Sequence, residues 1–264
     1  MAQPQSQRRP LVLCMLRYGI VEALKGVARR IPGLRFVYRS LRRTYNAYRL
    51  RNTPAEGIFT DIYTHNRWGG TTSVSGPGSG IDQTAVIAHA LPVVFRELNV
   101  HSLLDIPCGD FHWMRTVNLD GVHYIGADIV LPLVQRNKGA HGRTGIEFRH
   151  LNLVADRLPK VDLILCRDCL VHLCYADVFR ALVNICDSGS EYLLTTTFTS
   201  RAYNRDIATG DFHPLNVQQP PFAFPPPLRL INEQCTEGDG AYRDKSLGLW
   251  CIADLEHALP AHRS

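Results

Sequence analysis

The sequence lacks a long hydrophobic run. None of its apolar stretches reaches the roughly 18 consecutive residues that a membrane-spanning helix needs, and they have the length of β-strands instead. Hydrophobic residues still make up 45% of the 264 residues, which is enough for a sizeable core. This composition favours a globular fold over a membrane-spanning one.

The sequence also lacks a complete metal-binding motif. Cys166 and Cys169 have the spacing of a zinc-binding pair, but no second pair of this kind and no HxxxH element follows. Several of the eight cysteines lie in apolar runs, where a free cysteine behaves as a small buried hydrophobe. We therefore predict no metal, and a reducing, cytoplasmic compartment.

Acidic residues are almost absent from the first part of the chain. Residues 1–51 carry twelve Lys and Arg but one acid, Glu22, whereas the remainder carries 17 basic and 23 acidic residues. Apolar residues at three-to-four spacing over 11–31 predict an amphipathic helix. We predict a basic helical extension over 1–57 and a catalytic domain over 58–264.

Three interpretations of the extension stay open. It packs on the domain or on a partner subunit, it associates peripherally with an anionic membrane through residues 8–51, or it is a transit peptide. Because the excess of basic residues is confined to this segment, we expect no nucleic-acid partner.

Beyond residue 80 the pattern alternates between short apolar strands and amphipathic helices. Such alternation predicts an α/β fold with a mostly parallel sheet covered by helices on both faces. A Pro-rich stretch at 214–227 is predicted to be an ordered loop, because Phe222 and Phe224 give it something to bury. The expected strands are 102–106, 123–127, 146–149, 161–166, 191–199, 228–234 and 247–255, and the expected helices are 83–98, a helix start at 111–118, 131–138 and 175–186.

Acidic residues follow two neighbouring predicted strands. Asp105 ends the first strand and precedes a tight turn at Gly109, and Asp128 ends the second strand 23 positions later. The carboxyl ends of parallel strands form the ligand-binding edge of such a sheet, and an acid at the second strand can accept hydrogen bonds from a ribose. Taken alone, the two acids fit a nicotinamide dinucleotide as well as S-adenosylmethionine (SAM).

The run from Leu103 to Phe111, LLDIPCGDF, resembles the first motif of class I SAM-dependent methyltransferases. It keeps the acid and the middle glycine of that motif, while Pro107 and Phe111 replace the outer two glycines. A diphosphate needs more free N–H groups at this turn, and proline supplies none, which disfavours the dinucleotide. Three later runs are similar to the same family in order: Arg149–Leu153, Val161–Arg167 and Leu170–Leu173.

A narrower resemblance is to methyltransferase-like proteins found with bacterial polysaccharide genes. It is carried by Trp68-Gly69 and by Ser75-Gly76-Pro77-Gly78-Ser79, together with the run at the first strand. The family resemblance implies a Rossmann-like fold with a mostly parallel seven-stranded sheet.

The resemblance also implies how these residues would hold the cofactor. Asp105 would bind the methionine ammonium, Asp128 the ribose and Asn152 the adenine; the alternatives are a capping acid, a solvated strand end and a locally bonded loop residue. Arg167 would pair with the SAM carboxylate or an acidic acceptor, or else lie on the surface. Trp68 would form a lid or belong to the core. Neighbouring residues complete the predicted cofactor set: Pro107, Cys108, Gly109, Ile129 and Leu153.

Three histidines are candidates for the base of a methyl transfer, one of them paired with an aspartate. Asp168 lies four positions before His172, so the two could share a helical face, with the carboxylate orienting the imidazole. His213 lies in the loop after the fifth strand, where acceptors often enter this fold, and His112 follows the first turn. For each histidine, simple packing is the alternative.

We therefore predict a SAM-dependent methyltransferase acting on an oxygen or nitrogen of a small-molecule or glycan acceptor. Two alternatives stay open. One is a catalytically inactive SAM-fold binding or scaffold protein, and the other is an NAD-dependent oxidoreductase.

Overall fold

The structure is a computed structural model that describes residues 53–258. The predicted helical extension, apart from its last residues, and with it the proposed membrane-associating segment 8–51, lies outside the described residues. Within the described part, no helix combines the length and the apolar character needed to cross a bilayer.

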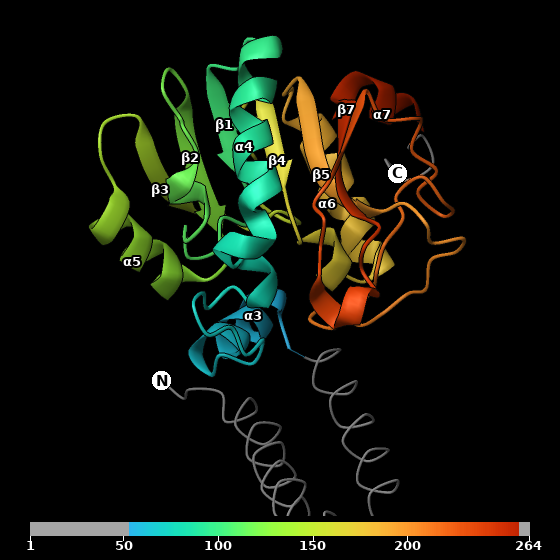
Figure 1. The fold of residues 1–264 in the computed structure, drawn as a ribbon, viewed down its shortest axis with the longest axis horizontal. Coiled ribbons are helices and arrows are strands. Elements are labelled where there is room, and N and C mark those ends of the chain that lie inside the picture. Colours follow the sequence, from blue (N-terminus) through green and yellow to red (C-terminus); the bar gives the residue numbers. More distant parts are fainter. Residues whose placement is uncertain (1–52, 259–264) are drawn as a thin grey trace, which may run out of the picture. The chain divides into compact units, whose positions relative to one another are not determined.

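A seven-stranded sheet forms the centre of the fold, in the order β3-β2-β1-β4-β5-β7-β6 (Figure 1). Strands β1 to β5 pair in parallel, and β7 runs antiparallel to both of its neighbours. The strands are β1 (Ser102–Asp105), β2 (His123–Asp128), β3 (Ile146–His150), β4 (Leu163–Cys166), β5 (Tyr192–Phe198), β6 (Arg229–Asn232) and β7 (Lys245–Cys251). The helices are α3 (Ala55–Thr64), α4 (Ile81–Glu97), α5 (Leu131–His141), α6 (Tyr175–Asp187) and α7 (Ile252–Ala258).

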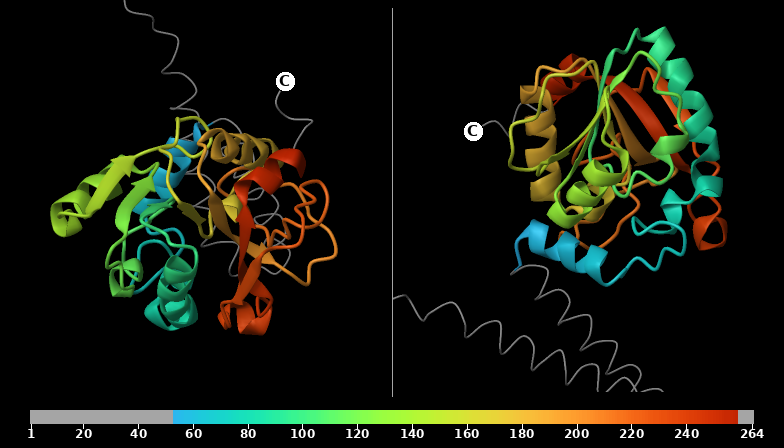
Figure 2. Two further views of the ribbon diagram at one scale, coloured as in Figure 1. Left: turned by 90° about the horizontal axis from the view of Figure 1, so that it is seen from above. Right: turned by 90° about the vertical axis from the view of Figure 1, so that its left-hand side faces the viewer.

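Helices cover both faces of this sheet, and α4 and α6 lie on opposite sides of it (Figure 2). Neighbouring residues of each buried strand alternate between two cores. Leu103 and Leu165 belong to the cluster that contains the apolar face of α4, whereas Leu104 and Ile164 belong to the cluster that contains α6 and α7. The strands are thus apolar on both sides because both sides are covered. The predicted Rossmann-like α/β fold with a mostly parallel seven-stranded sheet is confirmed.

Two local predictions were wrong. Residues 111–118 contain only a three-residue 3-10 helix, Met114–Thr116. Phe111 has a φ of 57°, which a continuing α-helix does not allow. The last predicted strand ends at Cys251, and α7 follows because Ile252 and Leu255, three residues apart, both pack into the core.

The Pro-rich stretch is an ordered loop, as predicted. Phe222 and Phe224 are 1% and 4% exposed, and the ring of Phe224 packs edge-on against Trp250 with 5.3 Å between ring centroids. The indole N–H of Trp250 also donates to the backbone oxygen of Pro225 at 2.8 Å. The loop is held by apolar burial and by backbone contacts.

The sheet order places a topological switch point between β1 and β4. After β1 the chain moves outward to β2 and β3, and then returns to the other side of β1. Ligands of open α/β sheets bind in the crevice at the carboxyl ends of the strands beside such a point. Asp105, Asp128 and Arg167 lie at or just after the carboxyl ends of β1, β2 and β4.

Candidate active site at the carboxyl edge of the sheet

A cavity of about 470 Å³ opens at this edge of the sheet. Its volume falls within the roughly 300–1,000 Å³ of small-molecule sites. Its wall contains side chains from α3, from the loop before α4, from the ends of β1, β2 and β4, and from the segments around β5 and β7. The predicted site residues that line it are Trp68, Asp105, Pro107, Cys108, Gly109, Asp128, Ile129, Arg167, Asp168 and His172.

Four predicted site residues do not line this cavity, and the candidate base His112 is one of them. Asn152 forms a local turn, in which its side-chain oxygen accepts from Val154 N at 2.9 Å, so the alternative interpretation describes its contacts better than the adenine role. Leu153 is buried in the core at 5% exposure. His213 is 3% exposed, with Nδ1 2.7 Å from the backbone oxygen of Arg205 and with no partner for Nε2.

Asp105 is a buried carboxyl at the bottom of the cavity. It is 3% exposed, and the hydroxyl of Tyr124 donates to its Oδ2 at 2.6 Å. Burial raises the pKa of Asp105 to about 7, although the Tyr124 hydrogen bond and the nearby charge of Arg167 act in the opposite direction. A cationic ligand group placed here would stabilise the ionised form.

Asp128 connects the end of β2 to the turn after β1. Its Oδ2 accepts from Gly109 N at 3.1 Å, and its Oδ1 accepts from Val130 N at 2.9 Å. Burial raises its pKa to about 6, and the backbone hydrogen bonds moderate that rise. Each carboxylate oxygen can accept more than one hydrogen bond, so hydroxyl groups of a ligand can still bind here.

The turn at Gly109 is closed by the loop over residues 73–75. Gly109 has a φ of 54°, and a Cβ on it would lie 2.3 Å from Ser75 Oγ, so both the conformation and the space require glycine. The Asp110 carboxylate accepts from Ser73 Oγ at 2.9 Å and from Val74 N at 3.0 Å, while Asp110 N donates to Ser75 Oγ at 3.0 Å. We call these hydrogen bonds the Asp110 clamp.

A cluster of four charged side chains lies beside the end of β4. Arg167 is 5% exposed, and its guanidinium donates to Glu233 Oε2 at 2.6 Å and lies 3.2 Å from Asp168 Oδ2. Lys245 Nζ donates to the same Asp168 oxygen at 2.6 Å and lies 3.4 Å from Glu233 Oε2. Burial opposes the charge of Asp168, but Arg167 and Lys245 hold the pKa of that carboxyl well below its usual range.

Arg167 is therefore not a surface residue, and its guanidinium already forms ion pairs with Glu233 and Asp168. Besides Glu233, it donates to the backbone oxygen of Gly78 at 2.9 Å, and it lies over the ring of Trp113 with 5.5 Å to the centroid. Through these contacts Arg167, which follows β4, binds both the loop before α4 and the residue that follows β6. Its predicted pairing with a ligand carboxylate stays a prediction.

The predicted pairing of Asp168 with His172 through a shared helical face is wrong. Asp168 has a φ of 52°, and only Leu170–His172 forms a short 3-10 helix, so the two residues do not lie on one face of an α-helix. The orienting contact of His172 comes instead from the backbone oxygen of Asp211, 2.8 Å from Nδ1.

That contact determines the state of the imidazole. A carbonyl oxygen can only accept, so Nδ1 carries the proton and Nε2 keeps its lone pair. Burial also lowers the pKa of His172, which favours the neutral ring at pH 7. Nε2 is therefore a proton acceptor in a residue that lines the cavity.

One side of the cavity is aromatic, a feature that the sequence did not reveal. Adjacent rings follow one another with centroid distances between 5.1 and 6.4 Å. Trp68, the predicted lid, packs against His172 at 5.1 Å with a 31° angle between the ring planes. We call this row the aromatic belt; it consists of Phe59, Trp68, His172, Phe212, Tyr242 and Phe198.

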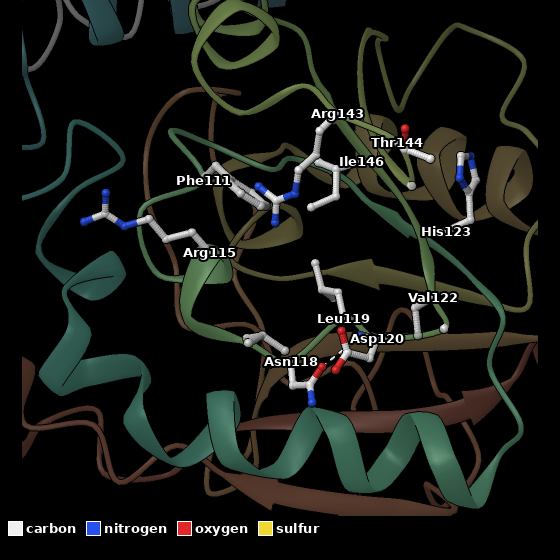
Figure 3. A pocket seen from close by; sticks show the side chains of 13 residues that line it. Phe111, Arg115, Asn118, Leu119, Asp120, Val122, His123, Arg143, Thr144 and Ile146 are labelled. Carbon is white, nitrogen blue, oxygen red and sulfur yellow. Dashed lines mark hydrogen bonds between the residues drawn. The ribbon is translucent and has the colours of Figure 1, made fainter.

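A second hollow, of about 490 Å³, lies elsewhere on the sheet (Figure 3). It is lined by the segment 117–123, which leads into β2, and by residues 143–146 before β3, so it lies at the amino ends of these strands. Its charged side chains, Arg115, Asp120 and Arg143, are exposed. None of the predicted site residues lines it.

The described residues contain no group of three or more His, Cys, Asp or Glu side chains placed to hold a metal ion.

Comparisons with known proteins do not assign a family. No family model matches the chain, and no curated protein sequence matches it. Among solved structures, human N-acetylserotonin methyltransferase in complex with SAM is similar at a TM-score of 0.42 and 18% identity, over 55% of this chain and 42% of that one. Magnesium protoporphyrin IX methyltransferase from Synechocystis PCC 6803 with bound SAM is similar at a TM-score of 0.42 and 16% identity, over 60% of this chain and 82% of that one.

A third similar structure is the methyltransferase domain of bacterial CtHen1, with a TM-score of 0.39 and 14% identity over 45% of this chain and 66% of that one. This chain thus spans less than half of the human enzyme's length. Because every one of these TM-scores is below 0.5, the function has to be argued from the cavity itself.

Proposed function

We propose that the protein is a SAM-dependent methyltransferase that methylates an oxygen or nitrogen of a small-molecule or glycan acceptor. The observation that carries this proposal is the cavity at the switch point, in which two buried carboxyls flank a turn that only glycine can form.

The chemistry of these residues fits SAM. A cationic amino-acid group would relieve the buried charge of Asp105, and ribose hydroxyls would donate to Asp128. Pro107 has no N–H to offer a diphosphate, and this argues against a nicotinamide dinucleotide. Gly109 also lines the cavity, and the Asp110 clamp holds the loop over 73–75 against its other side.

SAM supplies an electrophilic methyl group: as the acceptor forms its bond to that carbon, the C–S bond breaks and its electron pair stays on sulfur. The residues of this chain then have two tasks, to orient the acceptor and to take its proton. His172 Nε2 is the base that we assign, because Asp211 fixes its tautomer and burial keeps it neutral. Asp168 and Lys245 form the charged wall against which the acceptor would bind.

Isothermal titration calorimetry with SAM and with its demethylated product S-adenosylhomocysteine (SAH) tests the proposal. We expect binding by the full chain, at least tenfold weaker binding by Asp128→Ala, and unchanged binding by Arg143→Ala, a control in the second hollow (Figure 3). Absence of binding to both ligands by the wild type would refute the proposal. Binding of NADH instead would favour the oxidoreductase.

Binding of SAM alone does not separate an enzyme from a scaffold. Incubation with methyl-labelled SAM and candidate acceptors does, because only an enzyme transfers the label. The link to polysaccharide genes, the cytoplasmic location and the peripheral membrane association through residues 8–51 stay predictions.

A further inference from the structure

We infer that the part of the cavity between the aromatic belt and Asp168 is the acceptor subsite, and that it takes an uncharged ring with several hydroxyl groups, of the pyranose type. This inference rests on the proposed function, and it narrows the acceptor from any oxygen or nitrogen to a sugar hydroxyl.

The belt provides a continuous surface for apolar contact. His172 lies between Trp68 and Phe212, at 5.1 and 5.6 Å, and Tyr242 lies 5.5 Å from Phe212 and 5.8 Å from Phe198. All of these side chains also line the cavity. Phe212 is 37% exposed, so part of this surface is open to a ligand.

The belt rings are inclined to one another. The angle between ring planes is 31° for Trp68 and His172, 52° for His172 and Phe212, and 75° for Phe212 and Tyr242. Aromatic pairs prefer offset-stacked or edge-to-face contacts, so a flat ligand can stack on only one or two of these rings at a time. A puckered ring such as a pyranose has C–H groups that point in several directions, so it can contact several inclined rings at once.

Another part of the cavity wall carries charged side chains that pair with one another. Arg167 and Lys245 face Asp168 and Glu233, with closest separations of 2.6 Å for each cation. Glu237 also lines the cavity and acts on the charge of Arg167, so acids outnumber cations here and an anionic acceptor is disfavoured. The oxygens and the ammonium form strong hydrogen bonds with neutral partners, so this wall suits an uncharged, hydroxyl-rich ligand.

Asp168 is the member of this wall that a ligand can reach. Its side chain is 27% exposed, whereas those of Lys245 and Glu233 are 5% and 1% exposed. Asp168 Oδ2 accepts from Lys245, but the contact of Oδ1 with Thr196 Oγ1 is 3.4 Å long, so Oδ1 can accept from a hydroxyl. This carboxylate stays ionised at every pH at which the protein would be assayed.

The acceptor hydroxyl and the base would thus face each other across the subsite. When the hydroxyl oxygen forms its bond to the methyl carbon, its proton passes to His172 Nε2, which becomes a cationic imidazolium. The hydroxyl bound to Asp168 Oδ1 would be a neighbour on the same ring, so two adjacent hydroxyls would fix the orientation of the sugar.

Saturation-transfer-difference NMR on the full chain loaded with SAH tests the assignment. The probes are methyl pyranosides of glucose, galactose, mannose and rhamnose, with catechol as the flat aromatic probe. We expect saturation of the ring C–H protons of at least one pyranoside and none of catechol. Saturation of catechol alone, or of no probe at all, would overturn the inference.

Variants locate the bound sugar. Phe212→Ala removes an exposed ring of the belt, and Asp168→Asn removes the charge of the reachable acceptor, so each should weaken pyranoside binding about tenfold by the loss of one contact worth about 1.4 kcal/mol. Tyr203→Ala is the control, because Tyr203 is 81% exposed and does not line the cavity. Equal binding by all three variants would contradict the assigned subsite.

Calorimetry with SAH distinguishes a wrong acceptor assignment from a failure of the proposed function. If the wild type binds SAH but no pyranoside, the acceptor assignment is wrong and the cofactor site stands. If the wild type does not bind SAH, the proposed function itself has failed. Phe212→Ala and Asp168→Asn should keep their SAH affinity, which also shows that the variants are folded.

Discussion

The pKa of Asp105 makes cofactor binding dependent on pH. Its carboxyl titrates at about 7 because it is buried, and it must be ionised to pair with the ammonium of the cofactor. The ionised fraction is then about one half at pH 7 and about one eleventh at pH 6. The loss of the Asp105 charge alone should therefore raise the dissociation constant of SAH about fivefold between pH 7 and pH 6, and this contribution should approach a tenfold rise per unit below that.

Calorimetric titrations of SAH between pH 5.5 and 7.0 measure this effect, because the amino group of the ligand stays cationic in that range. The matched ligand is 5′-methylthioadenosine, which keeps the adenosine but lacks the amino-acid part. Its dissociation constant should rise only about twofold between pH 7 and pH 6, because Asp128, with a pKa of about 6, goes from about nine tenths to one half ionised. Equal pH dependence for both ligands between pH 6 and 7 would refute the reasoning.

Variants assign the effect to one carboxyl. Asp105→Asn should abolish the difference between the two ligands. Tyr124→Phe should move the midpoint of the SAH profile to higher pH, because the Tyr124 hydrogen bond lowers the pKa of Asp105. Asp120→Asn, an exposed acid of the second hollow, should leave the profile unchanged.

Three further predictions concern stability and catalysis. In the absence of ligand, Asp105→Asn should raise the free energy of unfolding at pH 8 by about a few kcal/mol. The reason is that the folded wild type binds more protons than the unfolded chain between about pH 4 and 7, so its stability falls as the pH rises through this range. Urea denaturation at pH 5 and pH 8 checks both the effect of the mutation and the fall in wild-type stability. Gly109→Ala should abolish SAH binding and should lower the free energy of unfolding more than Gly121→Ala does. Gly121 is the control, because it also has a positive φ but has nothing within 4 Å of an added Cβ. Equal losses of about 1–2 kcal/mol for the two variants would show that Ser75 does not crowd the turn. His172→Asn should lower kcat about 10²-fold or more with an unchanged SAH dissociation constant, and an unaltered kcat would remove His172 from the role of base.

The fold could be predicted because its signals are local. Buried parallel strands are short and have apolar residues at successive positions, and amphipathic helices have apolar residues at every third or fourth position. Both patterns can be recognised in a single sequence. The acids at the ends of β1 and β2 were found for the same reason. The error at residues 111–118 concerns Phe111, whose positive φ no sequence pattern signals and whose ring packs against Tyr124 from another strand at 5.2 Å.

The other half of the site could not be predicted, because it is assembled from distant segments. Glu233 and Lys245 contact residues 66 and 77 positions earlier in the chain, and nothing in their sequence surroundings signals this. The belt likewise joins α3 to the segments after β5 and before β7. The Asp110 clamp spans 35 to 37 positions, although a serine-rich loop and an acid beside the glycine turn were both visible in the sequence.

The short 3-10 helix at Met114–Thr116 has an electrostatic consequence. A long helix starting at the first turn would direct its positive end at the ligand and would attract anions from a distance. Three residues in a 3-10 turn generate no such field, so the part of the pocket beside the first turn selects its ligand by short-range contacts with carboxyls shielded from solvent. SAH affinity at pH 7 should accordingly change little between low and moderate ionic strength, in contrast to a site that collects phosphates.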